Sequence, residues 1–146
     1  MVKRVILGSD HAGYDLKESI KAHLSAGGYE VVDKGAFSVE SVDYPDFAHA
    51  VASIVASDAG ALGILVCGSG NGVNITANKH PGIRAALAWT AKIAALAREH
   101  NNANVVSLPA RFISAQEGLD IVDAFLAASF EGGRHELRVK KIDQAD

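Results

Sequence analysis

The only cysteine of the chain, Cys67, stands where an apolar run meets a series of alternating glycines. The run that ends with it, residues 63–67, is typical of a buried strand. The glycines that follow are Gly68, Gly70 and Gly72. They allow a tight turn whose N–H groups point inward, and a helix beginning near Asn71 adds the positive end of its dipole. A thiol beside a loop that favours an anion indicates acid–base or nucleophilic chemistry on a substrate that develops negative charge.

This loop does not match the common nucleotide-binding patterns. The stretch from Gly68 to Val73 departs from GxGxxG at its last position, no acidic residue follows about 20 positions later, and no GK[ST] follows either. For Cys67 itself two interpretations compete, a small buried hydrophobic residue and a reactive thiol. Its place at a strand end, before three spaced glycines and near a helix N-terminus, favours a reactive thiol.

Further polar groups follow the first and the last of the apolar runs. Asp10 and His11 come directly after the run at residues 3–8, and Arg111 comes shortly after the run at 104–108. If these runs are parallel strands, their carboxyl ends share one edge, which is where open α/β sheets bind ligands. Asp10 could instead only cap the helix that follows it, whereas histidine is not a favoured cap.

A second group of candidates has a structural explanation beside each functional one. Tyr44 either lines a pocket or packs in the core. His100 and Asn101 lie at the predicted end of a helix, where a histidine can stabilise the helix dipole or move protons. Arg134 and Arg138 are four residues apart on a short basic helix, so they form either a solvated face or a phosphate clamp.

The spacing of apolar residues predicts alternating strands and helices. The predicted strands are 3–8, 29–33, 63–67, 84–88 and 104–108, and the predicted helices are 14–26, 47–57, one from about 71, 90–99 and 114–129. This order is typical of a parallel sheet covered by helices, an α/β fold. The tail, about 131–146, adds a helix that is too short to be stable alone, and a partner subunit is the natural surface for it.

Length and composition limit the classes of protein that fit. With 146 residues, 49% of them hydrophobic, the chain has the size of one domain, 1–146. A net charge of -3 argues against nucleic acid or an anionic membrane as the main partner. No apolar run approaches the roughly 20 residues that span a bilayer. One cysteine cannot form an internal disulfide, and the first residues run into a predicted strand without a signal-peptide pattern, so we expect a cytoplasmic location.

Six stretches of the sequence together carry a resemblance to a known family. They are Gly8-Ser-Asp-His-Ala-Gly13, Asp43-Tyr-Pro-Asp-Phe-Ala48, Cys67-Gly-Ser-Gly-Asn-Gly72, Asn78-Lys-His-Pro-Gly-Ile-Arg-Ala85, His100-Asn-Asn-Ala-Asn104 and Gly133-Arg-His-Glu-Leu-Arg138. In this order and combination they resemble the ribose-5-phosphate isomerase B family, which includes galactose-6-phosphate and allose-6-phosphate isomerases. The resemblance covers essentially the whole chain.

The resemblance implies a fold, an assembly and a reaction. The fold is a Rossmann-like three-layer α/β/α sandwich with a five-stranded parallel sheet. The assembly is a homodimer or a dimer of dimers, with an active site built from both subunits. The reaction is an aldose–ketose isomerisation of ribose 5-phosphate to ribulose 5-phosphate, a step of the pentose phosphate pathway, with no metal and no organic cofactor.

The same resemblance implies roles for individual residues. Cys67 matches the base that moves a proton between two sugar carbons through an enediolate, and Ser69 stands where many members have threonine. Asp10 and His100 match residues that open the sugar ring and handle hydroxyl protons. The remaining matches bind substrate: the enediolate at Gly68, Gly70, Asn71 and Gly72, the sugar at Tyr44 and Asn101, and the phosphate at His11, Arg111, Arg134 and Arg138.

Two other functions stay open from the sequence. An isomerase of a hexose 6-phosphate or of a free sugar would need only a differently shaped pocket, a difference of about 1–3 kcal/mol. A non-catalytic subunit that binds a sugar phosphate belongs to another class. The presence of a thiol, an aspartate and a histidine in one chain argues against it.

Overall fold

The structure, a computed structural model, describes residues 3–144. Among them, five strands form one sheet in which every neighbouring pair is parallel. The strands are β1 (Arg4–Ser9), β2 (Glu30–Asp33), β3 (Ala61–Cys67), β4 (Ala85–Leu87) and β5 (Val105–Pro109), and their order across the sheet is β2-β1-β3-β5-β4. The predicted five-stranded parallel sheet is confirmed.

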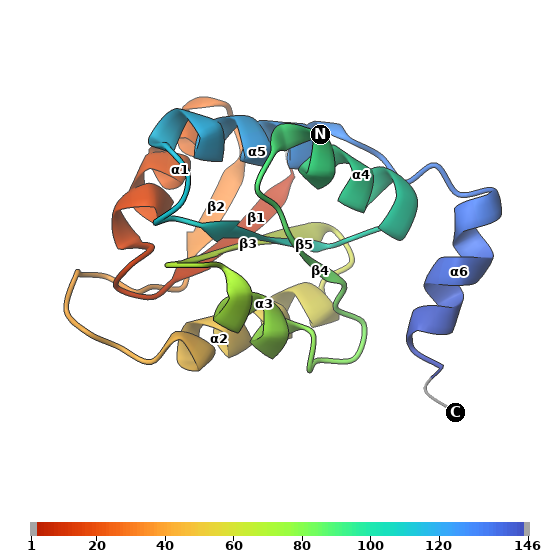
Figure 1. Cartoon of the computed structure of the whole chain (residues 1–146), viewed down its shortest axis with the longest axis horizontal. Coiled ribbons are helices and arrows are strands. Elements are labelled where there is room, and N and C mark those ends of the chain that lie inside the picture. The colour runs from red at the N-terminus through yellow and green to blue at the C-terminus, as the bar shows by residue number, and fades with distance from the viewer. Residues whose placement is uncertain (1–2, 145–146) are drawn as a thin grey trace.

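Helices cover both faces of the sheet, which confirms the predicted three-layer sandwich (Figure 1). One face carries α1 (Tyr14–Ala26), α4 (Ala91–Asn101) and α5 (Ala115–Ala127), and the other carries α2 (Tyr44–Ser57) and α3 (Asn71–Ala77). Helix α2 begins at Tyr44 rather than at Phe47, because Pro45 is tolerated in a first helical turn, where its missing N–H is not needed. Within residues 3–144, the helices lack the combination of length and apolar character that a membrane span requires.

The alternation of side chains along β3 decides which way its last residue points. Ile64 and Val66 pack in the half-core on the α1 side of the sheet. Leu65 and Cys67 pack in the half-core on the α2 side. Because successive side chains of a strand point to opposite faces, the thiol of Cys67 lies under α2 and α3.

The direction of winding reverses between β1 and β3. The chain leaves β1 toward β2 on one side of the sheet and leaves β3 toward β4 on the other. In open α/β sheets the ligand site lies outside the carboxyl ends of the strands at such a point. The loops found there are residues 10–13 after β1 and residues 68–70 after β3.

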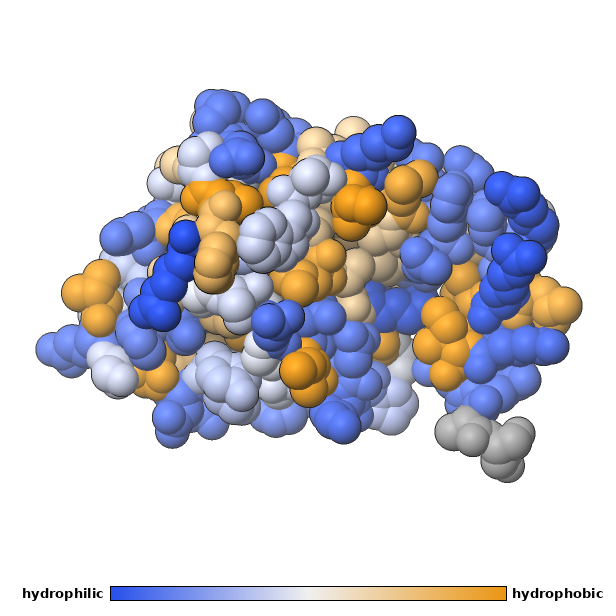
Figure 2. Space-filling view, viewed as in Figure 1, coloured by the Kyte–Doolittle hydropathy of each residue, from blue (hydrophilic) through white to orange (hydrophobic). Residues whose placement is uncertain are grey.

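The last helix, α6 (Arg134–Ile142), stands apart from the sandwich, at the end of the sheet opposite to the loop after β3 (Figure 1). Its residue His135 is buried, whereas Leu137 and Ile142 are exposed. Figure 2 shows a cleft between this helix and the body, with a volume of about 730 Å³ and a lining that includes Arg84, Asn101 and Ile142. The helix in the tail is confirmed, and its docking on a partner subunit stays a prediction.

Candidate active site

The loop after β3 has a backbone shape that requires glycine at its centre. Gly70 has a φ of 77°, and a Cβ built on it would lie 2.5 Å from the Leu87 side chain. The N–H of Asn71 donates a hydrogen bond to Ser69 Oγ over 3.3 Å. The next N–H groups of α3 belong to its first turn and have no carbonyl partner inside the helix. The loop therefore offers donors to an oxyanion, as the glycine spacing predicts.

Tyr44 and Arg111 both lie against this loop. A Cβ on Gly72 would come within 2.4 Å of the Tyr44 ring, so the ring rests directly on the backbone of the first turn of α3. A Cβ on Gly68 would lie 3.2 Å from Arg111 Nη1, and the Arg111 N–H donates to the Gly68 carbonyl over 3.0 Å. The structure thus brings a phenol and a guanidinium to the glycines, and a side chain at Gly68 or Gly72 would crowd them.

The thiol of Cys67 lies at the floor of the loop. The residue is 5% exposed and packs in one apolar cluster with Val51 and Val73. Its carbonyl oxygen accepts the N–H of Ala110 over 2.9 Å. The position beside the glycine loop agrees with a reactive thiol, and the burial agrees with a small hydrophobic residue. Both interpretations of this cysteine stand, and a substitution experiment separates them.

Asp10 and His11 occupy the loop after β1, beside the loop after β3. The carboxylate of Asp10 is buried, and its Oδ1 accepts the N–H of Gly13 over 3.0 Å, so this residue does shape the turn before α1. His11 Nδ1 accepts the N–H of Val42 over 3.1 Å. In the neutral ring the proton then resides on Nε2, which makes that nitrogen a donor for a hydroxyl or a phosphate oxygen.

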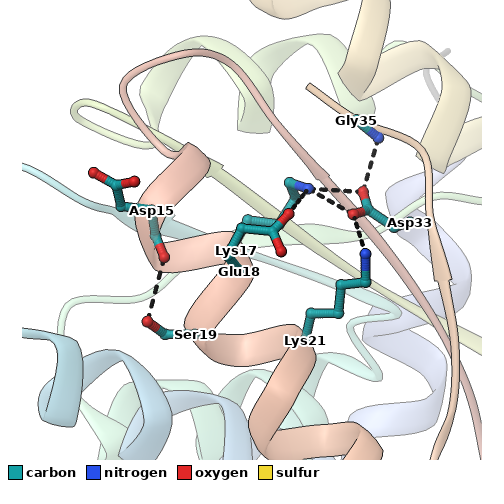
Figure 3. Close-up of polar contacts among 7 residues, drawn as sticks. All are labelled: Asp15, Lys17, Glu18, Ser19, Lys21, Asp33 and Gly35. Atoms are coloured by element: carbon teal, nitrogen blue, oxygen red, sulfur yellow. Dashed lines mark hydrogen bonds and ion pairs between the residues drawn. The ribbon is translucent and has the colours of Figure 1, made fainter. Parts of the chain in front are cut away.

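A network of hydrogen bonds around Asp33 joins α1, the end of β2 and Gly35 (Figure 3). Asp33 accepts hydrogen bonds from Lys17 Nζ at 2.7 and 2.8 Å, from Lys21 Nζ at 3.0 Å and from the N–H of Gly35 at 2.9 Å. Lys17 is fully buried, and its ammonium group also lies 3.2 Å from Glu18. The pattern of apolar residues did not predict a buried lysine in α1. Through Gly35 the network anchors the start of the loop whose far end meets His11.

The other predicted site residues form a second group around the ends of α4 and α6. The rings of His100 and His135 stack with centroids 4.3 Å apart and planes inclined by 15°. A pocket of about 340 Å³ is lined by His100, Asn101, His135, Arg138, Val139 and Ile142. Burial, together with the positive charges of His100 and Arg134, lowers the pKa of His135 and favours its neutral form. The sequence pointed to His100 and the arginines, but the stacking on His135 is a tertiary contact.

The two groups lie at opposite ends of the sheet. Cys67 is the last residue of β3, whereas His100 and Asn101 come before the first residue of β5, which runs parallel to β3. Val105, the first residue of β5, pairs with Gly63, so the four steps from Gly63 to Cys67 alone separate the two levels by about 13 Å, and His100 lies on the far side of Val105. One sugar phosphate therefore cannot touch Cys67 and His100 of the same chain. The structure brings together Cys67 with the loop residues and His100 with the tail, but not one set with the other.

A family model decides what kind of protein has this arrangement. The model described as ribose/galactose isomerase matches residues 5–142. The chain belongs to the ribose/galactose isomerase family. The match includes both groups of candidate residues, the loop after β3 and the tail helix.

Relatives and solved structures similar to this member of the ribose/galactose isomerase family agree with that assignment. Ribose-5-phosphate isomerase B of Mycolicibacterium paratuberculosis is 49% identical over 138 residues, covering 93% of this chain and 87% of the relative. That of Escherichia coli is 45% identical over 141 residues, covering 97% and 95%. The crystal structure of a ribose 5-phosphate isomerase from Thermotoga maritima has a TM-score of 0.95 at 49% identity, covering 98% and 99%. The Mycoplasma genitalium enzyme with bound ribulose 5-phosphate has a TM-score of 0.94 at 48% identity, covering 97% and 94%.

Proposed function

We propose that this chain is an isomerase that interconverts ribose 5-phosphate and ribulose 5-phosphate. The observation that supports this most directly is the loop after β3, where a thiol, a hydroxyl and the N–H groups of a helix start meet at the switch point of the sheet. Family membership, and the ribulose 5-phosphate bound to the Mycoplasma genitalium relative, support the same reaction. A cytoplasmic location and a place in the pentose phosphate pathway belong to this proposal.

In the proposed reaction Cys67 acts as the base. Its thiolate takes the proton from C2 of the open-chain aldose, and the electrons of that bond form an enediolate while the aldehyde oxygen gains negative charge. The Ser69 hydroxyl, which already accepts the Asn71 N–H, and the N–H groups near Gly72 donate to the enediolate oxygens. Each such donor is worth about 2.7–4 kcal/mol where it has been removed from other enzymes. Cys67 returns the proton to C1, and the hydroxyl proton on O2 passes to O1, which yields the ketose.

The separation of the two groups supports a site shared between subunits. In the proposed homodimer, His100 and Asn101 of one subunit face the Cys67 loop of the other, so that each of two sites is complete. The exposed apolar side chains of α6, Leu137 and Ile142, and the cleft beside that helix provide a surface for such docking. Pairing of two dimers into a tetramer stays a prediction.

Ring opening and phosphate binding follow from the same arrangement. Asp10 from one subunit and His100 from its partner would exchange the protons that open the sugar ring. The phosphate would lie between two sets of residues, His11 and Arg111 near the loop after β3 and Arg134 and Arg138 on α6 of the partner subunit. Each guanidinium group can donate two parallel hydrogen bonds to phosphate oxygens. No metal ion or organic cofactor takes part in these steps.

The test is a coupled assay of the purified chain against pentose phosphates, hexose phosphates and the free sugars. We expect the highest kcat/KM for ribose 5-phosphate, and the variant Cys67→Ala should lose about 10²–10⁴-fold in kcat, the contribution of a general base. Its unfolding curve and its mass in solution should match the wild type. Turnover that survives the substitution would leave Cys67 as a packing residue and would overturn the mechanism.

The assay also separates the other functions. Preference for a hexose 6-phosphate or for a free sugar would identify a different isomerase of the same family. Binding of sugar phosphates without turnover of any of them would identify a non-catalytic subunit.

A further inference from the structure

Three side chains from different segments converge beside the tail helix. His100 is in the last turn of α4, Glu131 is in the connection that follows α5, and His135 is in the first turn of α6. Glu131 Oε1 lies 3.7 Å from His100 Nε2 and 3.6 Å from His135 Nε2. One ligand atom from each of the three lies within 4.8 Å of the others, and among residues 3–144 this is the only such group of three.

Two imidazoles and a carboxylate are a ligand set for zinc. Zinc binds imidazole nitrogen at about 2.0–2.1 Å and carboxylate oxygen at about 2.0–2.2 Å, so ligand atoms around a tetrahedral ion lie roughly 3.3 Å apart. The observed separations from Glu131 to the two histidines exceed this by only a few tenths of an ångström. An imidazole binds a metal in the plane of its ring, and the two rings are stacked at 15°, so the half-exposed ring of His100 has to turn out of the stack for both nitrogens to bind one ion. Three protein ligands would leave the fourth position to water or to an anion, as in open zinc sites.

The surroundings both help and oppose a cation. His135 is 7% exposed, and its imidazole is held in the neutral form, which is the form that ligates a metal. Glu131 is exposed, so an ion has a way in. Against binding, Arg134 Nε lies 3.5 Å from His135 Nε2, and Arg138 adds a second positive charge. A contact of 3.5 Å is at the limit of a hydrogen bond, and both arginines are exposed and free to turn toward water.

We propose that His100, Glu131 and His135 form a binding site for Zn²⁺, and that zinc bound there inhibits the enzyme. The inhibitory part rests on the proposed function, because it requires His100 to act on the substrate. The binding part does not. Zinc at this place would occupy the imidazole that ring opening needs and would displace the arginines that hold the phosphate.

Binding is tested on the full chain by titration with ZnCl₂ in competition with a chromogenic chelator, in a buffer without phosphate at pH 7.5. We expect one Zn²⁺ per chain, and Glu131→Gln and His135→Asn should each weaken it at least tenfold. Glu131 is exposed, so its variant tests the site even where His135→Asn fails to fold. The matched control is His80→Asn, because His80 Nε2 and His49 Nδ1 lie 2.6 Å apart on the surface without a third ligand.

Zinc binding that survives both Glu131→Gln and His135→Asn, or that is lost in His80→Asn, would overturn the site. Anomalous scattering at the zinc edge from a soaked crystal gives a second readout, with the expected peak between Glu131 and the two histidines. The thiol is the other obvious zinc ligand, so Cys67→Ala should bind zinc as the wild type does. Loss of binding in that variant would also overturn the proposal.

Inhibition is tested on the wild type and on Glu131→Gln, each relative to its own activity without zinc. We expect Zn²⁺ to inhibit the wild type reversibly, with recovery on adding EDTA and with competition by ribose 5-phosphate, and the variant to need at least tenfold more zinc. Zinc that binds as expected but does not inhibit would uphold the site, overturn the inhibitory part and contradict the proposed role of His100.

Discussion

Replacing Asp33 by asparagine leaves a buried ammonium group without its counter-charge. Lys17 is fully buried, the Asp33 side chain is 7% exposed, and Lys17 Nζ lies 2.7 Å from Asp33 Oδ2. The third member, Lys21, is 41% exposed, so water screens it and it contributes little. The loss of stability in Asp33→Asn therefore depends on the buried ion pair between Lys17 and Asp33.

The magnitude follows from the asymmetry of buried ion pairs. Removing one partner of such a pair costs about 3–5 kcal/mol, because the other charge stays buried and uncompensated. Glu18 remains 3.2 Å from Lys17 in the variant, so we expect the lower end, about 3 kcal/mol of unfolding free energy. The double variant Lys17→Met/Asp33→Asn buries no unpaired charge and should lie within about 1 kcal/mol of the wild type. The double variant should therefore be about 2 kcal/mol more stable than Asp33→Asn, which is non-additivity of the kind found for residues in contact.

The effect should depend on pH in a defined direction. Burial raises the pKa of Asp33, but hydrogen bonds from Lys17, the Gly35 N–H and Lys21 outweigh it, so that the pKa is lowered overall. A carboxyl group with a lowered folded-state pKa stabilises the protein above its unfolded value of about 3.9, and this contribution is lost as the pH falls through the folded value. The difference between wild type and Asp33→Asn should therefore be constant from pH 6 to 8 and shrink below about pH 4.

The measurement is urea unfolding followed by circular dichroism, at one fixed protein concentration because the stability of the proposed dimer would depend on it. Lys17→Met, Asp33→Asn and the double variant complete the cycle. An Asp33→Asn protein within about 1 kcal/mol of the wild type would show that the pair is not desolvated as the structure has it. A double variant less stable than Asp33→Asn would show that the cost is not an unpaired charge.

Two other predictions concern the site itself. Gly70→Ala should lower kcat and cost about 1–2 kcal/mol of stability or more, since the φ of 77° is unfavourable for alanine and the new Cβ would meet Leu87. The matched control is Gly82→Ala, where the φ is 83° but a new Cβ would have no atom within 4 Å. Equal losses in the two variants would rule out the contact with Leu87 as a cause. Arg138→Gln should raise the KM for ribose 5-phosphate about tenfold or more, which is the value of one hydrogen bond to a charged group, and should leave any activity on free ribose unchanged. The control is Lys140→Gln on the same helix. Equal effects of the two variants would mean that the phosphate is attracted only by the overall positive charge of the helix.

Much of one half of the site could be predicted from local patterns. Asp10, the Cys67 loop and Arg111 all follow apolar runs, and in a parallel sheet the ends of neighbouring strands share an edge. Strand order was not readable from the spacing, yet it matters, because only the adjacency of β1 and β3 puts Asp10 next to the glycines. Periodicity also missed Lys17, whose burial depends on Asp33, a residue from another element.

For the residues around the tail helix, the sequence predicted which ones are candidates but not where they lie relative to Cys67. His100, Arg134 and Arg138 were candidates from their types and their helical spacing. That they gather around His135 and Glu131, at the far end of the sheet from Cys67, depends on how α6 folds back after the connection from α5. No spacing along the chain encodes that distance.

The amino-acid sequence by itself determined the alternation of strands and helices, the glycine loop and the types of groups that can bind a sugar phosphate, because these depend on contacts between near neighbours. Tertiary structure alone decided which of these groups meet. It placed the Cys67 loop and the His100 cluster at opposite edges of the sheet, left Cys67 only 5% exposed, and stacked His100 on His135, 35 residues further along the chain. The physical reason is that strand order and helix docking are set by the burial of apolar faces over the whole chain, which no single stretch contains.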